Sequence, residues 1–175
     1  MKTFRYILPI ILILIILAMV MIFYAKASPD SFGKKHPIPD GMEYNLPLTG
    51  KSHLTAPADT LDSKACLVLW NDIQGGIYKY DFYYGPLPAG EIFLRCYEAT
   101  ENIPLSAERI LQRSKVGIDS TASFTQLVDK QRFTIYEGDW DDYYAARVEV
   151  WFRDAATKQE RKLVEKVYRV EGWMR

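Results

Sequence analysis

Side chains that could catalyse a reaction near neutral pH are scarce in this sequence. The two histidines, His36 and His53, both lie in a segment dense in proline and glycine. The chain contains none of the short motifs that mark a serine nucleophile, a zinc protease or a phosphate-binding glycine loop. Any pair chosen from the 22 acidic residues would be arbitrary without geometry. We therefore expect a noncatalytic protein that carries no cofactor.

The two cysteines, Cys66 and Cys96, are the candidates for redox chemistry. Each falls in a segment with strand character, and in an oxidising compartment the two thiols could form a disulfide. The alternative is that both are small buried apolar side chains, because Cys96 alternates in phase with Ile92 and Leu94. Tetrahedral zinc needs more ligands than two distant cysteines and two histidines in another segment can offer, so we expect no metal.

An acidic cluster precedes one of the expected strands. It consists of Glu137, Asp139, Asp141 and Asp142. Gathered carboxylates can ligate calcium, but this spacing does not match an EF-hand loop. With Gly138 among these residues, a solvated turn is the simpler interpretation.

Aromatic and arginine side chains provide the candidate binding site. Strand alternation places Trp151 on the charged side of its strand, and an outward tryptophan beside arginines is typical of a protein interface. In another strand, alternate aromatic residues share one face that we expect to pack in the core, and Tyr83 lies on the opposite face. The candidate binding residues are Trp151, Arg147, Arg153 and Tyr83. A protein partner is preferred, and a glycan is the alternative because sugar rings stack on the same residue types.

Short segments rich in aromatic and β-branched residues must position these side chains. The expected strands are Ala65–Asn71, Ile77–Tyr84, Glu91–Ala99, Ser123–Val128, Arg132–Glu137, Tyr143–Arg153 and Arg161–Val170. The last two form a terminal hairpin, and Ser106–Arg113 is expected as a short helix with Ser106 as its cap. The pattern predicts an all-β fold, an antiparallel β-sandwich of about seven strands, over residues 61–175.

Two stretches are similar to known β-sandwich families. Tyr143 and Tyr144, between an acidic turn and a strand, resemble the tyrosine corner of immunoglobulin-like domains, which implies a phenol bonded to upstream backbone. Residues 90–100, followed by Pro104 and Leu105, are similar to the early strand and turn of transthyretin-like modules. The resemblances imply an immunoglobulin-like or transthyretin-like sandwich and assign no site residue.

The amino-terminal segment predicts a membrane helix. Residues 6–24 contain no charge, and at 1.5 Å per residue this helix would span roughly 28 Å, the thickness of the hydrocarbon core. Residues 1–5, with Lys2 and Arg5, would form a short cytoplasmic segment. Residues 25–60, dense in proline and glycine, are expected as an extracytoplasmic linker that includes an edge strand near residues 42–48. The alternative is a signal peptide cleaved between Ala27 and Ser28.

Charge and topology together define the expected function. With 22 basic and 22 acidic residues, the chain lacks the cationic surplus that nucleic-acid binding requires. We expect a single-pass protein held in membrane lipid by its amino-terminal helix, with the bulk of the chain on the periplasmic or extracellular side. There it would bind a protein partner as an envelope-associated module, for example of the immunity type. A secreted or anchored glycan-binding module is the alternative.

Overall fold

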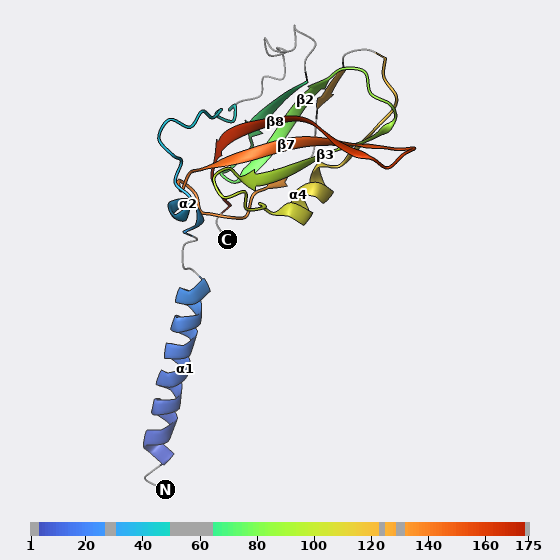
Figure 1. Ribbon diagram of the computed structural model, residues 1–175. Helices are drawn as coiled ribbons and strands as arrows, with labels where there is room; N and C mark the ends of the chain where they lie inside the picture. Colours follow the sequence, from blue (N-terminus) through green and yellow to red (C-terminus); the bar gives the residue numbers. More distant parts are fainter. Residues whose placement is uncertain (1–3, 27–30, 50–64, 123–124, 129–131, 174–175) are drawn as a thin grey trace. The chain divides into compact units, whose positions relative to one another are not determined.

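The computed structural model describes residues 4–26, 31–49, 65–122, 125–128 and 132–173 of the chain (Figure 1). The chain divides into two compact units, Met1–Pro29 together with Arg175, and Asp30–Met174. The first unit contains helix α1 (Phe4–Lys26), whose described side chains, at residues 11–22, are exposed and apolar or small. Among the residues that the structure describes, no helix has the length and hydropathy required of a membrane span.

The second unit contains two antiparallel sheets, which confirms the prediction of a sandwich-like all-β fold. The β2 sheet has the order β1 (Cys66–Asn71), β2 (Ile77–Tyr84), β5 (Thr125–Val128), and β6 (Phe133–Thr134) also pairs with β2. The β7 sheet has the order β4 (Val116–Ile118), β3 (Gly90–Glu98), β7 (Tyr144–Asp154), β8 (Glu160–Val170). Strand β4 was not expected, and the other strands overlap the seven predicted ones.

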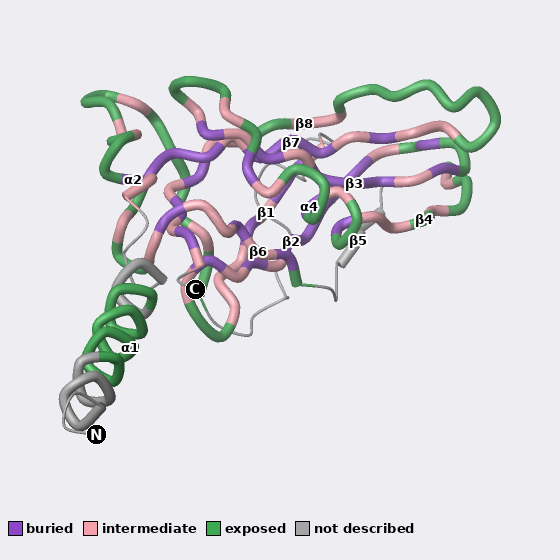
Figure 2. The backbone as a smooth tube through the Cα atoms, turned by 90° about the horizontal axis from the view of Figure 1, so that it is seen from below, coloured by how far each residue is buried: buried purple, intermediate pink, exposed green. Residues whose placement is uncertain are grey.

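The core lies between the two sheets and follows strand alternation (Figure 2). On β2 the alternate aromatic residues are buried in it, as predicted: Tyr78, Tyr80, Phe82 and Tyr84. The β7 sheet contributes branched and small side chains, among them Val148, Val150, Ile92, Leu94 and Cys96. The β7 sheet also places the rings of Tyr144, Phe152 and Tyr168 in this core, and this packing buries the inner face of each sheet.

Buried phenols join the two sheets to each other and to the loops. Tyr168 of β8 donates to the carbonyl of Leu67 on β1 (2.9 Å) and accepts from the amide of Leu69 (3.3 Å). The phenol of Tyr80 donates to the carbonyl of Ser114 (3.0 Å). Burial raises the pKa of Tyr168, so its hydroxyl stays protonated and keeps its donor.

The predicted tyrosine-corner hydrogen bond is present at Tyr144. Its phenol donates to the carbonyl of Glu137, seven residues upstream, at 2.7 Å. Tyr78 makes a similar bond to the carbonyl of Glu171 (3.1 Å) and accepts from the amide of the same residue (3.0 Å). These bonds fix the loop that leads into β7 and the chain that leaves β8.

Residues 31–49, expected to belong to a linker, pack against the sandwich. Helix α2 (Phe32–Lys35) sets the ring of Phe32 against that of Tyr144, with the ring centroids 5.1 Å apart. Further on, Asn45 pairs with β8 and Leu48 pairs with β1, each in parallel. The edge strand expected near residues 42–48 is therefore two single bridges, one to each sheet. Of the linker, residues 27–30 and 50–60 lie outside the described part of the chain.

Helix α4 (Ala107–Ser114) matches the predicted helix, but the prediction of its cap was wrong. Ser106 adopts a left-handed backbone conformation with a φ of 43° and makes no side-chain cap bond. Its hydroxyl donates instead to Glu137 (2.7 Å), whose carboxylate also accepts from the Ser106 amide (2.9 Å). Glu137 therefore accepts hydrogen bonds from the amide and the hydroxyl of Ser106, the residue before the helix. Ile110 packs α4 against the core.

Replacing Tyr168 with Phe tests the link between the sheets. We expect the free energy of unfolding in urea to fall by about 1–3 kcal/mol, because a buried carbonyl and a buried amide lose their shared partner. The control is Tyr97→Phe on the outer side of β3, for which we expect a change within about 0.5 kcal/mol. Equal losses in the two variants would contradict the role assigned to Tyr168.

Candidate functional site

The candidate site is the outer face of the β7 sheet, the side turned away from the core. As predicted, Trp151 shares this side of β7 with arginine and glutamate residues, while Val150 and Phe152 are buried on the other side. Antiparallel pairing sets a residue of β3 opposite each outward residue of β7. The cross-strand pairs are Glu91 with Arg153, Phe93 with Trp151, Arg95 with Glu149, and Tyr97 with Arg147. Aromatic and charged residues therefore alternate along the outer face.

Trp151 lies at an irregularity in the sheet. The pairing of β7 with β8 shifts register between Val150 and Trp151, as in a β-bulge. The half-buried indole donates from Nε1 to Glu149 (2.8 Å), and the guanidinium carbon of Arg95 lies 4.3 Å from its ring centroid. Trp151 is therefore held on two sides, with part of its surface in solvent.

Phe93 is the aromatic residue at the centre of this face. It has no exposed surface, although its neighbours Ile92 and Leu94 are the ones that enter the core. The guanidinium carbons of Arg95 and Arg153 each lie 5.3 Å from its ring centroid. The two arginines thus cover an apolar ring while their charged ends remain available for hydrogen bonding.

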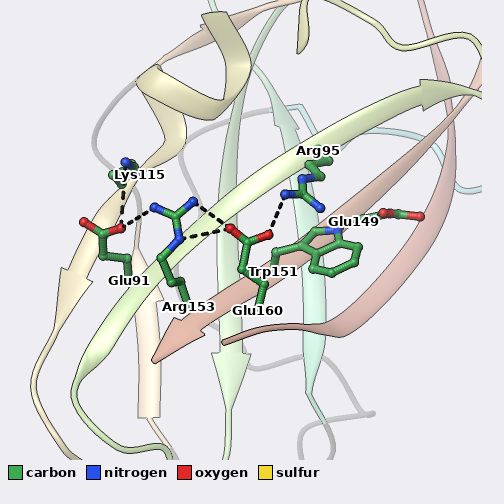
Figure 3. Close-up of polar contacts among 7 residues, drawn as sticks. All are labelled: Glu91, Arg95, Lys115, Glu149, Trp151, Arg153 and Glu160. Carbon is green, nitrogen blue, oxygen red and sulfur yellow. Dashed lines mark hydrogen bonds and ion pairs between the residues drawn. The ribbon is translucent and has the colours of Figure 1, made fainter. Parts of the chain in front are cut away.

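Ion pairs connect these arginines across three strands (Figure 3). Glu160 of β8 accepts from Arg153 (2.6 Å) and from Arg95 (2.7 Å). Glu91 lies 3.3 Å from Arg153 and 3.7 Å from Lys115. Hydrogen bonds from Arg153, and then those from Arg95, hold the pKa of Glu160 below its ordinary value. The carboxylate therefore stays charged, and the guanidinium groups are fixed in position before any ligand binds.

Glu149 is the most enclosed acid of the outer face, with 4% of its surface exposed. It accepts hydrogen bonds from Trp151, Arg147 (3.0 Å) and Lys162 (3.3 Å). Burial alone would raise the pKa of Glu149, but these three donors outweigh burial and lower it. An ionised carboxylate is thus the centre that orients the indole, a guanidinium and an ammonium group.

Tyr83, the fourth predicted site residue, is not part of this face. It lies on β2, in the other sheet, opposite Cys66 of β1, and only 6% of its surface is exposed. Burial is the main cause of the raised pKa of its phenol. Alternation correctly predicted that Tyr83 points away from the core aromatics, but its side chain is buried there and not exposed. The prediction missed Phe93, Arg95 and Tyr97 on β3, which the same alternation rule could have found.

The two cysteines do not form the disulfide that an oxidising compartment would allow. Cys66 and Cys96 are both buried thiols. Cys96 of β3 belongs to the core, where burial raises the pKa of its thiol. Cys66, at the start of β1 in the other sheet, has its sulfur 3.4 Å from the ammonium of Lys166. The alternative to a disulfide, that both cysteines are small buried side chains, describes Cys96 well. Cys66 is also buried, and its sulfur makes a polar contact with Lys166.

Candidate histidine and acidic residues that the structure describes contact other segments of the chain. His36 lies 2.8 Å from the carbonyl of Phe32 through Nδ1 and 3.6 Å from Glu101 through Nε2, and His53 lies outside the described residues. In the acidic loop Glu137 binds Ser106, and Asp142 accepts from the amide of Lys34 (3.2 Å). Within the described part of the chain, no group of three or more potential metal ligands is present.

No protein-family model matches the chain, and no curated protein or solved structure matches it either. The function is therefore inferred from the chemistry of the outer face and from the organisation of the chain.

A Glu149→Gln variant tests the centre of the outer face. At neutral pH we expect the free energy of unfolding to fall by about 1–2 kcal/mol, because the charged acceptor of three donors is lost. The pKa of Glu149 is lower in the folded chain than its ordinary value of 4.5, so its stabilising effect is present above that value. The difference from wild type should shrink as the pH falls below it.

The measurement is urea unfolding of both proteins across this pH range. Glu165→Gln is the matched control, because the Glu165 side chain is 47% exposed and pairs with the same Lys162. We expect it to cost less than about 0.5 kcal/mol. A loss for Glu149→Gln that does not change with pH would exclude the charge as the cause.

Proposed function

We propose that this protein is a membrane-anchored, extracytoplasmic, noncatalytic module that binds another protein through the outer face of the β7 sheet. The observation that carries the proposal is Trp151, a partly exposed indole at a bulge, oriented by Glu149 and flanked by arginines. Tryptophan, tyrosine and arginine are the residues that contribute most to binding at protein interfaces.

The arrangement of the arginines supports binding at this face. The guanidinium groups of Arg95, Arg147 and Arg153 are stacked on aromatic rings and paired with carboxylates. A long side chain that is already ordered loses less conformational entropy when a partner binds. The outer face can therefore present planar donors and an indole edge to a partner at a reduced entropic cost.

The alternative glycan function is less well supported by the geometry. A sugar ring stacks on a flat aromatic surface, and one side of the Trp151 indole already carries Arg95 at 4.3 Å. Phe93 is covered by two guanidinium groups and has no exposed surface. The aromatic surface that remains exposed is better suited to edge-on and polar contacts with a protein than to stacking on a sugar ring.

The proposed location rests on the amino-terminal sequence. The uncharged run of residues 6–24 falls within helix α1, and basic residues precede it at positions 2 and 5. An anchored sandwich with its amino terminus inside the cell would act at the outer surface of the membrane, as an envelope-associated protein or one that neutralises a partner there. An immunoglobulin-like relation is proposed for the sandwich on the tyrosine-corner bond of Tyr144. The transthyretin-like alternative is proposed on the sequence of residues 90–100.

A Trp151→Ala variant tests the binding face. The full-length protein is crosslinked in membranes of expressing cells and purified, and the proteins bound to it are quantified. We expect partner recovery to fall at least about tenfold, because a central interface tryptophan contributes 2 kcal/mol or more. The control is Trp140→Ala, since Trp140 is 42% exposed but lies in the loop before β7.

Full recovery with Trp151→Ala would exclude the outer face as the interface. If oligosaccharides change the tryptophan fluorescence of the wild type and no protein is recovered, the glycan function replaces the proposed one.

Intact mass of the protein in the membrane and soluble fractions tests the anchor. We expect a full-length species that resists extraction by alkaline carbonate, because an uncharged apolar sequence as long as residues 6–24 favours the bilayer. A soluble species that begins at Ser28 would contradict the anchor and leave the sandwich as a secreted domain.

A further inference from the structure

A second group of positively charged residues lies in a pocket of about 380 Å³ formed by α4 and β6 with the start of β2. This pocket is separate from the outer face. Its polar lining consists of Arg109, Gln112, Arg113, Arg132, Thr134 and Tyr136. We name it the arginine pocket.

Helix and strand periodicities bring these residues together. Arg109, Gln112 and Arg113 are spaced i, i+3 and i+4, so they share one side of α4, and Ile110 on another side is buried in the core. In the segment through β6, Phe133 and Ile135 are buried, which turns Arg132, Thr134 and Tyr136 to the opposite side. Both elements therefore direct their polar side chains into the same pocket.

The pocket has a surplus of positive charge. Arg132 pairs with Asp72, which also pairs with Lys79 at 2.9 Å. Among the described residues, none supplies a carboxylate partner to Arg109 or Arg113. On the outer face, by contrast, Arg95, Arg147 and Arg153 are each paired with a glutamate. Within the described part of the chain, Arg109 and Arg113 thus lack the carboxylate partner that the three arginines of the outer face have.

Acidic residues close in sequence are directed elsewhere. Glu108 lines a different pocket, on the β3 side of α4. Glu137, next to Tyr136, is engaged by the amide and hydroxyl of Ser106. Arg109 is ordered by its position over the Tyr136 ring, with its guanidinium carbon 4.5 Å from the centroid. The positive charge therefore stays within the pocket and is partly preorganised.

We propose that the arginine pocket binds the phosphate group of a phosphate monoester. Guanidinium groups form paired hydrogen bonds with phosphate oxygens, and Thr134 and Gln112 offer neutral donors beside them. Two arginines without a carboxylate partner, Arg109 and Arg113, match a group with two negative charges better than a single carboxylate. The volume exceeds that of phosphate alone and leaves room for the group that carries it. The phosphate can belong to a soluble ester or to a lipid headgroup.

Titration with inorganic phosphate tests the pocket. The full-length protein is placed in phosphatidylcholine nanodiscs, and the Nε–H signals of its arginines are followed by NMR at constant ionic strength. We expect saturable shifts for Arg109 and Arg113 with phosphate and none with chloride. Equal shifts with phosphate and chloride would overturn the proposal.

Variants locate the binding and control for folding. A double variant, Arg109→Gln with Arg113→Gln, should bind phosphate at least about tenfold more weakly, because two charge-assisted contacts are lost. Arg161→Gln is the matched control, since Arg161 is an exposed arginine on β8. We expect its affinity to stay within about twofold of wild type. Equal weakening in the control and the double variant would overturn the proposal, and so would no weakening in the double variant.

Lipid composition distinguishes the two sources of phosphate. Nanodiscs that contain phosphatidic acid are compared with phosphatidylcholine nanodiscs in buffer without phosphate. Shifts of Arg109 and Arg113 caused by phosphatidic acid alone would support a lipid headgroup, and saturation by free phosphate in phosphatidylcholine would support a soluble ester. No response in either arm would overturn the site, while the protein-binding function of the outer face would be unaffected.

Discussion

The structure depends on the requirement that each buried phenol find a hydrogen-bond partner. The aromatic core places several tyrosine hydroxyls between the sheets, where water is not available to satisfy them. Four of these phenols bind a backbone group on another element. Tyr168 joins β8 to β1, and Tyr80 joins β2 to the end of α4. Tyr78 and Tyr144 fix the chain at the end of the sandwich where β7 begins and β8 ends. The hydrogen bonds that satisfy the buried phenols therefore also position the two sheets, helix α4 and two loops.

The side chains of β3 and β7 that enter the core determine which of their neighbours form the outer face. On β3 and β7 every residue that enters the core is followed by one that points outward, so the inner set of small and branched side chains fixes the outer set. The register then pairs Phe93 with Trp151 and Arg95 with Glu149. Charges that would repel one another in another register are neutralised in this one, and the aromatic rings are covered by guanidinium groups. The same network stabilises the sheet and holds a binding surface in a defined geometry.

Sequence patterns predicted what depends on local periodicity. Alternation correctly assigned the buried aromatic side of β2, the outward position of Trp151 and the terminal hairpin. It failed where a contact between residues far apart in the sequence determines whether a side chain is buried or which partner it binds. Tyr83 is on the predicted side of its strand but is covered, and Ser106 binds Glu137 instead of capping its helix. The arginine pocket combines a helical period over residues 109–113 with a strand period over residues 132–136, and only the packing of α4 against β6 shows that the two sets of side chains meet.

The paired segment at residues 45–48 also affects how the domain behaves in concentrated solution. Asn45 exchanges backbone hydrogen bonds with Val167 and Arg169 of β8, and Leu48 does so with Leu69 and Asn71 of β1. The phenol of Tyr168 occupies a further carbonyl and amide on β1. Strand edges with open backbone groups recruit other chains and lead to aggregation. A fragment that begins at residue 61, where the sequence pattern changes, would expose these groups, so the shortest well-behaved fragment should include the residues from 31 onward.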